Sequence, residues 1–185
     1  MKRNLLFMLW VIITATSCAS IPPTTENGST ILSSTRWVTT AVYKQVKGEF
    51  DRSVNYINDP VAQGTVSSAQ YSLDRFVFVP VDTKTGKFDL SNISALVKNN
   101  GKYELLYDTN GKLNRRLYDT SLGYTNSRVI ERLNSDEFSY IFNKDGENFL
   151  VEHRPFVKIY PGVTYPSELQ DAISKLFQKQ QLKGL

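Results

Sequence analysis

The pattern of hydrophobic and polar residues is clearest between Ile93 and Phe156, where short apolar runs are separated by dipeptides typical of tight turns. Two-residue hairpin turns favour such dipeptides because both central residues adopt positive φ. The dipeptides in this stretch are Asn100-Gly101, Asn110-Gly111 and Asp145-Gly146. Between them, apolar and polar residues alternate with the period of a half-buried strand. The stretch therefore predicts an antiparallel sheet with one buried face.

Alternation also predicts which side chains share the buried face. They form three sets: Tyr103, Leu105 and Tyr107; Phe138, Tyr140 and Phe142; Phe149, Val151 and His153. Upstream, Trp37–Tyr43 and Tyr71–Val79 are further predicted strands, and the apolar residues 76–79 indicate a strand covered on both faces. Residues 48–70 are polar and rich in turn residues, so they hold either a short strand at Val54–Ile57 or a long rim loop.

The C-terminal stretch changes to a helical pattern after Pro166. Ser167 and Gln170 have the spacing of a capping box, followed by apolar residues at Leu169, Ala172, Ile173, Leu176 and Phe177. This helix either packs on the sheet or presents an amphipathic face to a partner or membrane. The fold class is thus predicted as mainly β: an antiparallel barrel or strongly curved sheet of about seven to nine strands with one C-terminal helix.

The N-terminus has the three-part layout of an export signal, with Lys2 and Arg3 before an apolar run at residues 5–13. The next residues, Ala15-Thr16-Ser17-Cys18, resemble the lipobox of bacterial lipoproteins, in which the cysteine becomes acylated. We predict a signal peptide at 1–17, a lipidated flexible tether at 18–35, a β-barrel-like domain at 36–158 and a C-terminal segment with an amphipathic helix at 159–185. The alternative is a secreted protein cut after Ala19.

Composition narrows the chemistry. The chain of 185 residues carries a net charge of +4, too weak and scattered to predict a nucleic-acid partner, and Arg115-Arg116 is interpreted as a solvated face. One Cys and one His supply no zinc or iron–sulfur ligand set, so no metal or cofactor is expected. His153 shares a face with Phe149 and Val151, which predicts a hydrogen-bonded, inward-facing histidine. No Gly-x-Ser-x-Gly elbow accompanies it, and we expect a protein that is not an enzyme.

Residues 113–156 resemble a bacterial lipoprotein family known only as domain of unknown function 4822. The resemblance lies in Asp119-Thr120, Leu133-Asn134, Asp145-Gly146 and the closing Val151-Glu152-His153-Arg154-Pro155-Phe156, with Arg154 where that family tends to be apolar. Members of the family look lipocalin-like, so the resemblance implies a small antiparallel barrel. It implies no activity or ligand.

These observations predict an exported protein with a non-enzymatic binding role, lipid-anchored through Cys18 and held on the outer membrane if the cell has one. The expected partner is a small apolar ligand or another envelope protein. For the ligand, the candidate residues are Trp37, Tyr103, Tyr140, Phe142 and His153. The alternatives are a structural, envelope-assembly or exclusion-type interaction protein and an envelope hydrolase.

Overall fold

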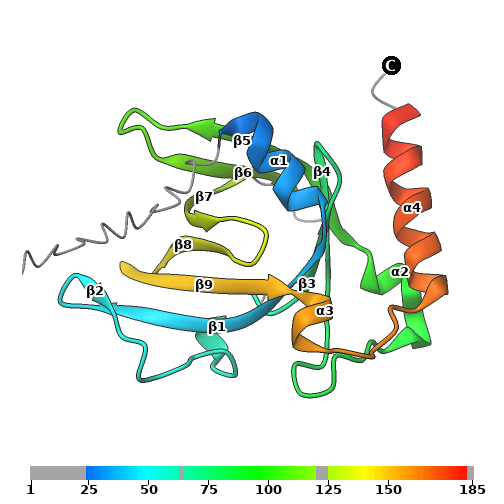
Figure 1. Ribbon diagram of the computed structural model, residues 1–185, viewed down its shortest axis with the longest axis horizontal. Helices are drawn as coiled ribbons and strands as arrows, with labels where there is room; N and C mark the ends of the chain where they lie inside the picture. Colours follow the sequence, from blue (N-terminus) through cyan, green and yellow to red (C-terminus); the bar gives the residue numbers. More distant parts are fainter. Residues whose placement is uncertain (1–23, 63–64, 120–124, 183–185) are drawn as a thin grey trace, which may run out of the picture.

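Nine strands form one antiparallel sheet that closes on itself (Figure 1). The computed structural model describes residues 24–62, 65–119 and 125–182. The strands are β1 (Arg36–Val46), β2 (Glu49–Phe50), β3 (Ser68–Tyr71), β4 (Arg75–Val79), β5 (Asn99–Tyr107), β6 (Leu113–Asp119), β7 (Thr125–Leu133), β8 (Phe138–Lys144) and β9 (Glu147–Pro155). The helices are α1 (Thr25–Ser33), α2 (Ile93–Leu96), α3 (Phe156–Ile159) and α4 (Ser167–Leu182), with 3₁₀ turns η1 (Pro60–Ala62) and η2 (Leu90–Asn92).

Strand β1 closes the barrel because it pairs along both of its edges. Its first residues pair with β3, and residues 37–44 pair with β9, so that Trp37 lies between Ala69 and Pro155. From β3 to β9 each strand is hydrogen-bonded to the next in the sequence. The result is an eight-stranded barrel, with the short β2 paired to the end of β1. This confirms the predicted mainly β class, an antiparallel barrel of lipocalin-like form with a C-terminal helix.

The chain turns at two of the three predicted dipeptides, but only Asp145-Gly146 forms the predicted two-residue hairpin with positive φ at both residues. Asp145 and Gly146 have φ of 54° and 81° and connect β8 to β9 as a tight hairpin. Gly111 lies in the loop between β5 and β6, with φ of 73°. The prediction of a turn at Asn100-Gly101 is wrong, because both residues lie inside β5. Gly101 is required there for a different reason: a Cβ would lie 2.0 Å from the carbonyl oxygen of Tyr118 on β6.

The strand predicted at Tyr71–Val79 is two strands, β3 and β4, joined by a tight turn at residues 72–74. The backbone N–H of Ser72 donates to the Arg75 carbonyl oxygen at 2.9 Å and holds this turn. The run at residues 76–79 is covered on both sides as expected, since Phe76 belongs to the barrel core while Val77 and Val79 pack outside it. Residues 54–57 form a loop and no strand.

The structure corrects the flexible tether predicted for residues 18–35, because residues 25–33 form helix α1. The Thr24 side chain caps the helix by accepting a hydrogen bond from the Asn27 backbone N–H at 3.2 Å. Leu32 is fully buried in the barrel core, and Gly28 packs so closely that an added Cβ would lie 2.6 Å from Leu105 Cδ1. Polar composition concealed this helix, since only Ile31 and Leu32 in it carry large apolar side chains.

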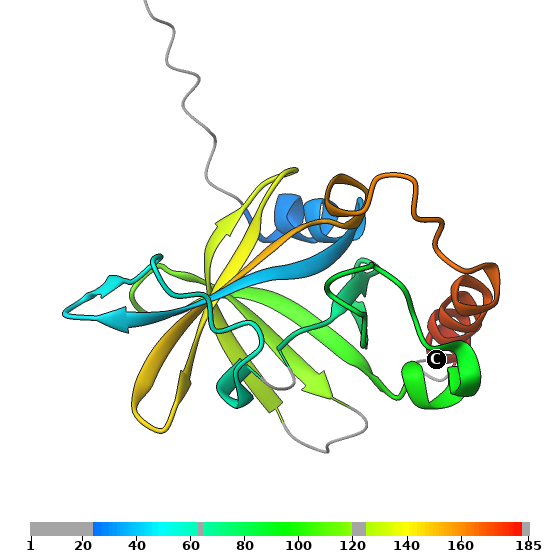
Figure 2. The ribbon, with the colours of Figure 1, turned by 90° about the horizontal axis from the view of Figure 1, so that it is seen from below.

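The C-terminal helix α4 packs on the outside of the barrel, beside β4 (Figures 1 and 2). Leu169 and Ile173 are fully buried against Val77 and Val79, which confirms the prediction of a helix that covers the sheet. The predicted capping box does not form, because Ser167 is the first helical residue and its hydroxyl contacts Glu168 at 3.2 Å. Of the helices described, none has both the length and the apolar character to cross a bilayer.

Candidate ligand-binding site inside the barrel

The five residues predicted to bind a ligand all point into the barrel. Trp37 enters from β1, Tyr103 from β5, Tyr140 and Phe142 from β8 and His153 from β9. All five are buried. Four of them belong to one hydrophobic core cluster: Trp37, Tyr103, Tyr140 and Phe142. Strand alternation therefore placed these side chains correctly. Cys18, the predicted lipid attachment site, lies outside the described residues.

His153 is buried between aromatic rings. Its ring stacks on Phe138 with centroids 5.0 Å apart, and Tyr140 lies on its other flank at 5.3 Å. Nδ1 lies 3.2 Å from the Phe138 carbonyl oxygen, which can only accept, so Nδ1 carries the proton of the neutral imidazole. Burial, and then the nearby positive charge of Arg115, lower its pKa from 6.5 to about 3. The prediction of a hydrogen-bonded, inward-facing histidine is confirmed.

Arg115 is the interior residue that the sequence interpretation missed. It lies on β6 between the inward-facing Leu113 and Leu117, and only 2% of its surface is exposed. Its guanidinium carbon lies 4.5 Å from the ring centroid of Tyr140 and 5.1 Å from that of Phe138. The adjacent pair was interpreted as a solvated face, and this holds only for Arg116, which points outward to Glu104. The alternation of Leu113, Arg115 and Leu117 was the signal that could have found it.

Three tyrosine hydroxyls add polar groups to this aromatic interior. The Tyr71 hydroxyl accepts a hydrogen bond from Nη1 of Arg115, and its pKa is raised well above the usual value because the ring is buried. The Tyr103 hydroxyl donates to the Ser72 carbonyl oxygen at 2.9 Å, and burial raises its pKa to about 12. Both hydroxyls therefore keep their protons at neutral pH. With Tyr140, they add hydroxyl groups to a mostly aromatic interior that also holds His153 and Arg115.

Both ends of the barrel are covered. Helix α1 lies over one end, where Gly28 meets Leu105 near the end of β5, Leu113 at the start of β6 and Leu133 at the end of β7. Nε1 of Trp37 donates to the Leu32 carbonyl oxygen at 3.0 Å and fixes the helix there. At the other end, Tyr56 packs edge-on against Phe149 with centroids 6.4 Å apart, and Ala62 of η1 is fully buried.

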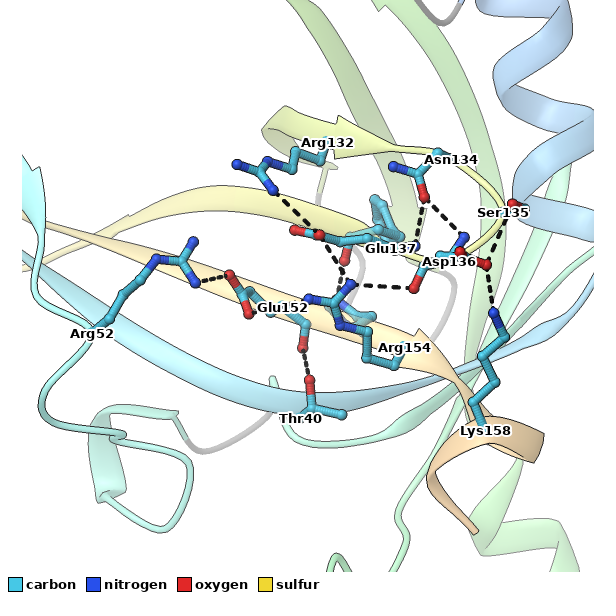
Figure 3. Close-up of polar contacts among 12 residues, drawn as sticks. Thr40, Arg52, Arg132, Asn134, Ser135, Asp136, Glu137, Glu152, Arg154 and Lys158 are labelled. Carbon is cyan, nitrogen blue, oxygen red and sulfur yellow. Dashed lines mark hydrogen bonds and ion pairs between the residues drawn. The ribbon is translucent and has the colours of Figure 1, made fainter. Parts of the chain in front are cut away.

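A second polar cluster lies on the outer wall, over β8, β9 and the turn before β8 (Figure 3). Its centre is Arg154, which lies 3.0 Å from a Glu137 carboxylate oxygen and 3.9 Å from one of Glu152. Glu137 and Glu152 are only 6% and 5% exposed, although Glu152 lies on the face of β9 opposite to Val151 and His153. Arg132 also pairs with Glu137 at 3.5 Å, and Arg52 with Glu152 at 2.6 Å.

This outer cluster of Arg52, Arg132, Glu137, Glu152 and Arg154 contains the two most buried carboxylates of the described chain. It is therefore the candidate location for a catalytic acid or base. Each of the two is engaged by two arginines, an arrangement typical of a structural ion-pair network. Among the described residues, no three His, Cys, Asp or Glu side chains lie close enough to hold a metal ion. The outer cluster thus offers ion pairs, whereas the barrel interior offers an enclosed aromatic surface with one buried cation.

No protein-family model matches the chain, and no curated protein sequence matches it. The resemblance of residues 113–156 to the domain of unknown function 4822 stays a prediction from the residues quoted for it.

Proposed function

We propose that this protein is a non-enzymatic binding protein of the bacterial envelope, lipid-anchored through Cys18, whose barrel binds one small apolar molecule. The observation that carries the proposal is the convergence of aromatic side chains from β1, β5 and β8 on one enclosed interior. An eight-stranded barrel is just wide enough to be filled by side chains or to hold one small ligand. The core side chains are buried in this structure. The ligand therefore enters the barrel interior when an element that covers one end of the barrel moves aside.

Helix α1 is the covering element best suited to move. It is nine residues long, shorter than helices that are stable alone, and it buries only Gly28 and Leu32. Elements with few buried apolar contacts open at low free-energy cost. Displacement of α1 would withdraw Leu32 from the core and leave apolar space between Trp37 and Tyr103 at this end of the barrel.

Two measurements test the proposal. Intact-mass analysis of full-length protein, extracted gently from membranes, should show acyl chains on Cys18 and one co-purified small molecule that is lost on denaturation. Purified protein should also bind the neutral fluorophore N-phenyl-1-naphthylamine saturably, with one site per barrel. Absence of both a co-purified molecule and saturable fluorophore binding would overturn the proposal.

A matched pair of variants assigns the fluorophore to the interior. Leu117 points into the barrel and is 6% exposed, whereas its neighbour Tyr118 points outward and is 39% exposed. Leu117→Trp should weaken fluorophore binding because the larger ring fills interior space, and Tyr118→Trp should leave it unchanged. Equal loss in both variants would place the fluorophore on the outer surface and contradict an interior site.

The second candidate is a protein-interaction role on the outside of the barrel. Its support is helix α3, where Val157 and Ile159 are 65% and 39% exposed. Exposed apolar side chains of this kind can mark a protein-interaction surface. Val157→Asp should then abolish capture of an envelope protein while leaving fluorophore binding intact.

A further inference from the structure

Arg115 is a buried cation that forms no ion pair with another charged residue of the described chain. Of its guanidinium nitrogens, Nη1 donates to the neutral hydroxyl of Tyr71, while Nε has no hydrogen-bond partner. No carboxylate of the described chain forms an ion pair with it. The buried carboxylates, Glu137 and Glu152, are on the outer wall and engaged by other arginines.

Aromatic rings compensate part of this charge. Four ring centroids lie within 5.8 Å of the guanidinium carbon, those of Tyr71, Phe78, Phe138 and Tyr140. Such contacts attract a cation through the negative faces of the rings. They do not replace hydrogen-bond acceptors, and a guanidinium has five N–H donors to satisfy. A buried charge that lacks them is costly, so the site favours an anion that supplies acceptors.

A second guanidinium increases the positive potential in the interior. Arg128 on β7 is the cross-strand partner of Arg115, so the two side chains share the inner face, and Arg128 lies 5.1 Å from the Phe142 ring centroid. Like charges directly opposite each other on a sheet repel. The positive charge of Arg115 also contributes, after the larger effect of burial, to the lowered pKa of His153. An anion between or beside the two arginines would relieve this repulsion.

We propose that the ligand of the barrel is an amphiphile with a single carboxylate, and that Arg115 and the Tyr71 hydroxyl bind this carboxylate while the aromatic wall surrounds the apolar body. This inference rests on the proposed binding function. A carboxylate matches the planar fork of a guanidinium and accepts two parallel hydrogen bonds from it, which suits the free Nε. The Tyr71 hydroxyl, which now accepts from Arg115, keeps its own proton to donate to the second oxygen.

The test compares an acid with its neutral ester. Wild-type protein should bind 11-(dansylamino)undecanoic acid about tenfold or more tightly than its methyl ester, the scale of one charge-assisted hydrogen bond. Arg115→Met should reduce this preference to about one while still binding the ester. Arg116→Met is the matched control, because that neighbour points outward to Glu104 and its side chain is 40% exposed. It should leave the preference unchanged.

The outcomes separate the two proposals. Equal binding of acid and ester by the wild type, or an unchanged preference in Arg115→Met, would overturn the carboxylate inference and leave the binding function standing. Failure to bind either probe would overturn both. Should Arg115→Met not fold, decanoate labelled with ¹³C at its carboxyl carbon tests the wild type directly. Its bound resonance should not move between pH 7 and 4.5, because the guanidinium stabilises the carboxylate, and titration like that of free decanoate would overturn the inference.

Discussion

The imidazole of His153 lies against the ring of Phe138 and, at 3.2 Å, against the carbonyl oxygen of the same residue. One residue of β8 thus supplies both the apolar surface and the hydrogen-bond acceptor that keep the histidine neutral. Because the two strands pair residue for residue there, with Phe138 opposite His153, the sheet itself sets this geometry. The histidine therefore contributes to stability in its uncharged form.

We predict that His153 makes the folded protein less stable in acid. Its pKa is about 3 in the folded state and 6.5 when unfolded, so between these values only the unfolded chain binds the proton. The contribution is fully present above pH 6.5, and it falls by about 1.4 kcal/mol per pH unit as the pH drops toward 3. Urea unfolding of wild type and His153→Gln from pH 7.5 to 4.5 should show a shallower decline in the variant. Parallel declines would contradict the buried neutral state.

We predict that Gly101→Ala strongly destabilises the barrel. The new Cβ would lie 2.0 Å from the Tyr118 carbonyl oxygen, a backbone atom that cannot move without separating β5 from β6. Overpacking of this kind costs on the order of 1–3 kcal/mol, occasionally more. Lys102→Ala, at the exposed neighbouring position, is the control and should change the free energy of unfolding little. A similar midpoint of urea unfolding for both variants would show that the strands separate easily here.

Gly101 also shows where sequence interpretation succeeded and failed. Alternation on β8 and β9 predicted the inner face correctly because inward-facing side chains recur with a period of two, although residues on the outer face of β9 are buried as well. The dipeptide at residues 100–101 has the composition of a turn, yet it lies in a strand because of a neighbour that the sequence does not reveal. Helix α1 was missed for the same reason, because its position depends on contacts with distant strands rather than on local pattern. The inward position of Arg115, by contrast, could have been predicted from its alternation with Leu113 and Leu117.

We predict that Arg154→Met destabilises the protein more than Lys158→Met. Arg154 lies between two buried carboxylates, Glu137 and Glu152, and its removal leaves each with one fewer cation. Loss of a charged partner from a buried group costs about 1–3 kcal/mol, reduced here because Arg132 and Arg52 remain. Lys158 instead pairs with the exposed Asp136 at 2.6 Å, a contact in water that contributes little.

Thermal unfolding of both methionine variants measures this difference. The Tm of Lys158→Met should stay close to that of the wild type, and 0.5 M NaCl should not change the gap between the two variants by much, because the ion pairs of Arg154 are partly shielded from solvent. Equal losses of Tm would contradict the greater weight assigned to the buried carboxylates.

We predict that helix α4 contributes to folding stability through Ile173. This side chain is fully buried against Val77 and Val79 on the outer face of β4. Ile173→Ala removes apolar contacts and leaves a cavity, which costs about 2–5 kcal/mol. Lys175→Ala, two residues further along the same helix and exposed, is the control. An unchanged free energy of unfolding for Ile173→Ala would indicate that α4 is only loosely associated with the barrel.

The last prediction concerns α1 as the route into the barrel. A Cβ at Gly28 would lie 2.6 Å from Leu105 Cδ1, so positions 28 and 105 are in contact where α1 meets β5. In a Cys18→Ser chain, which removes the only native thiol, the Gly28→Cys/Leu105→Cys pair should form a disulfide that holds α1 on β5. If ligands pass where α1 lies, oxidised protein should lose binding of N-phenyl-1-naphthylamine and recover it with reductant. Leu105→Cys alone should bind equally in both conditions. Unchanged binding by the oxidised double variant would show that ligands reach the interior elsewhere.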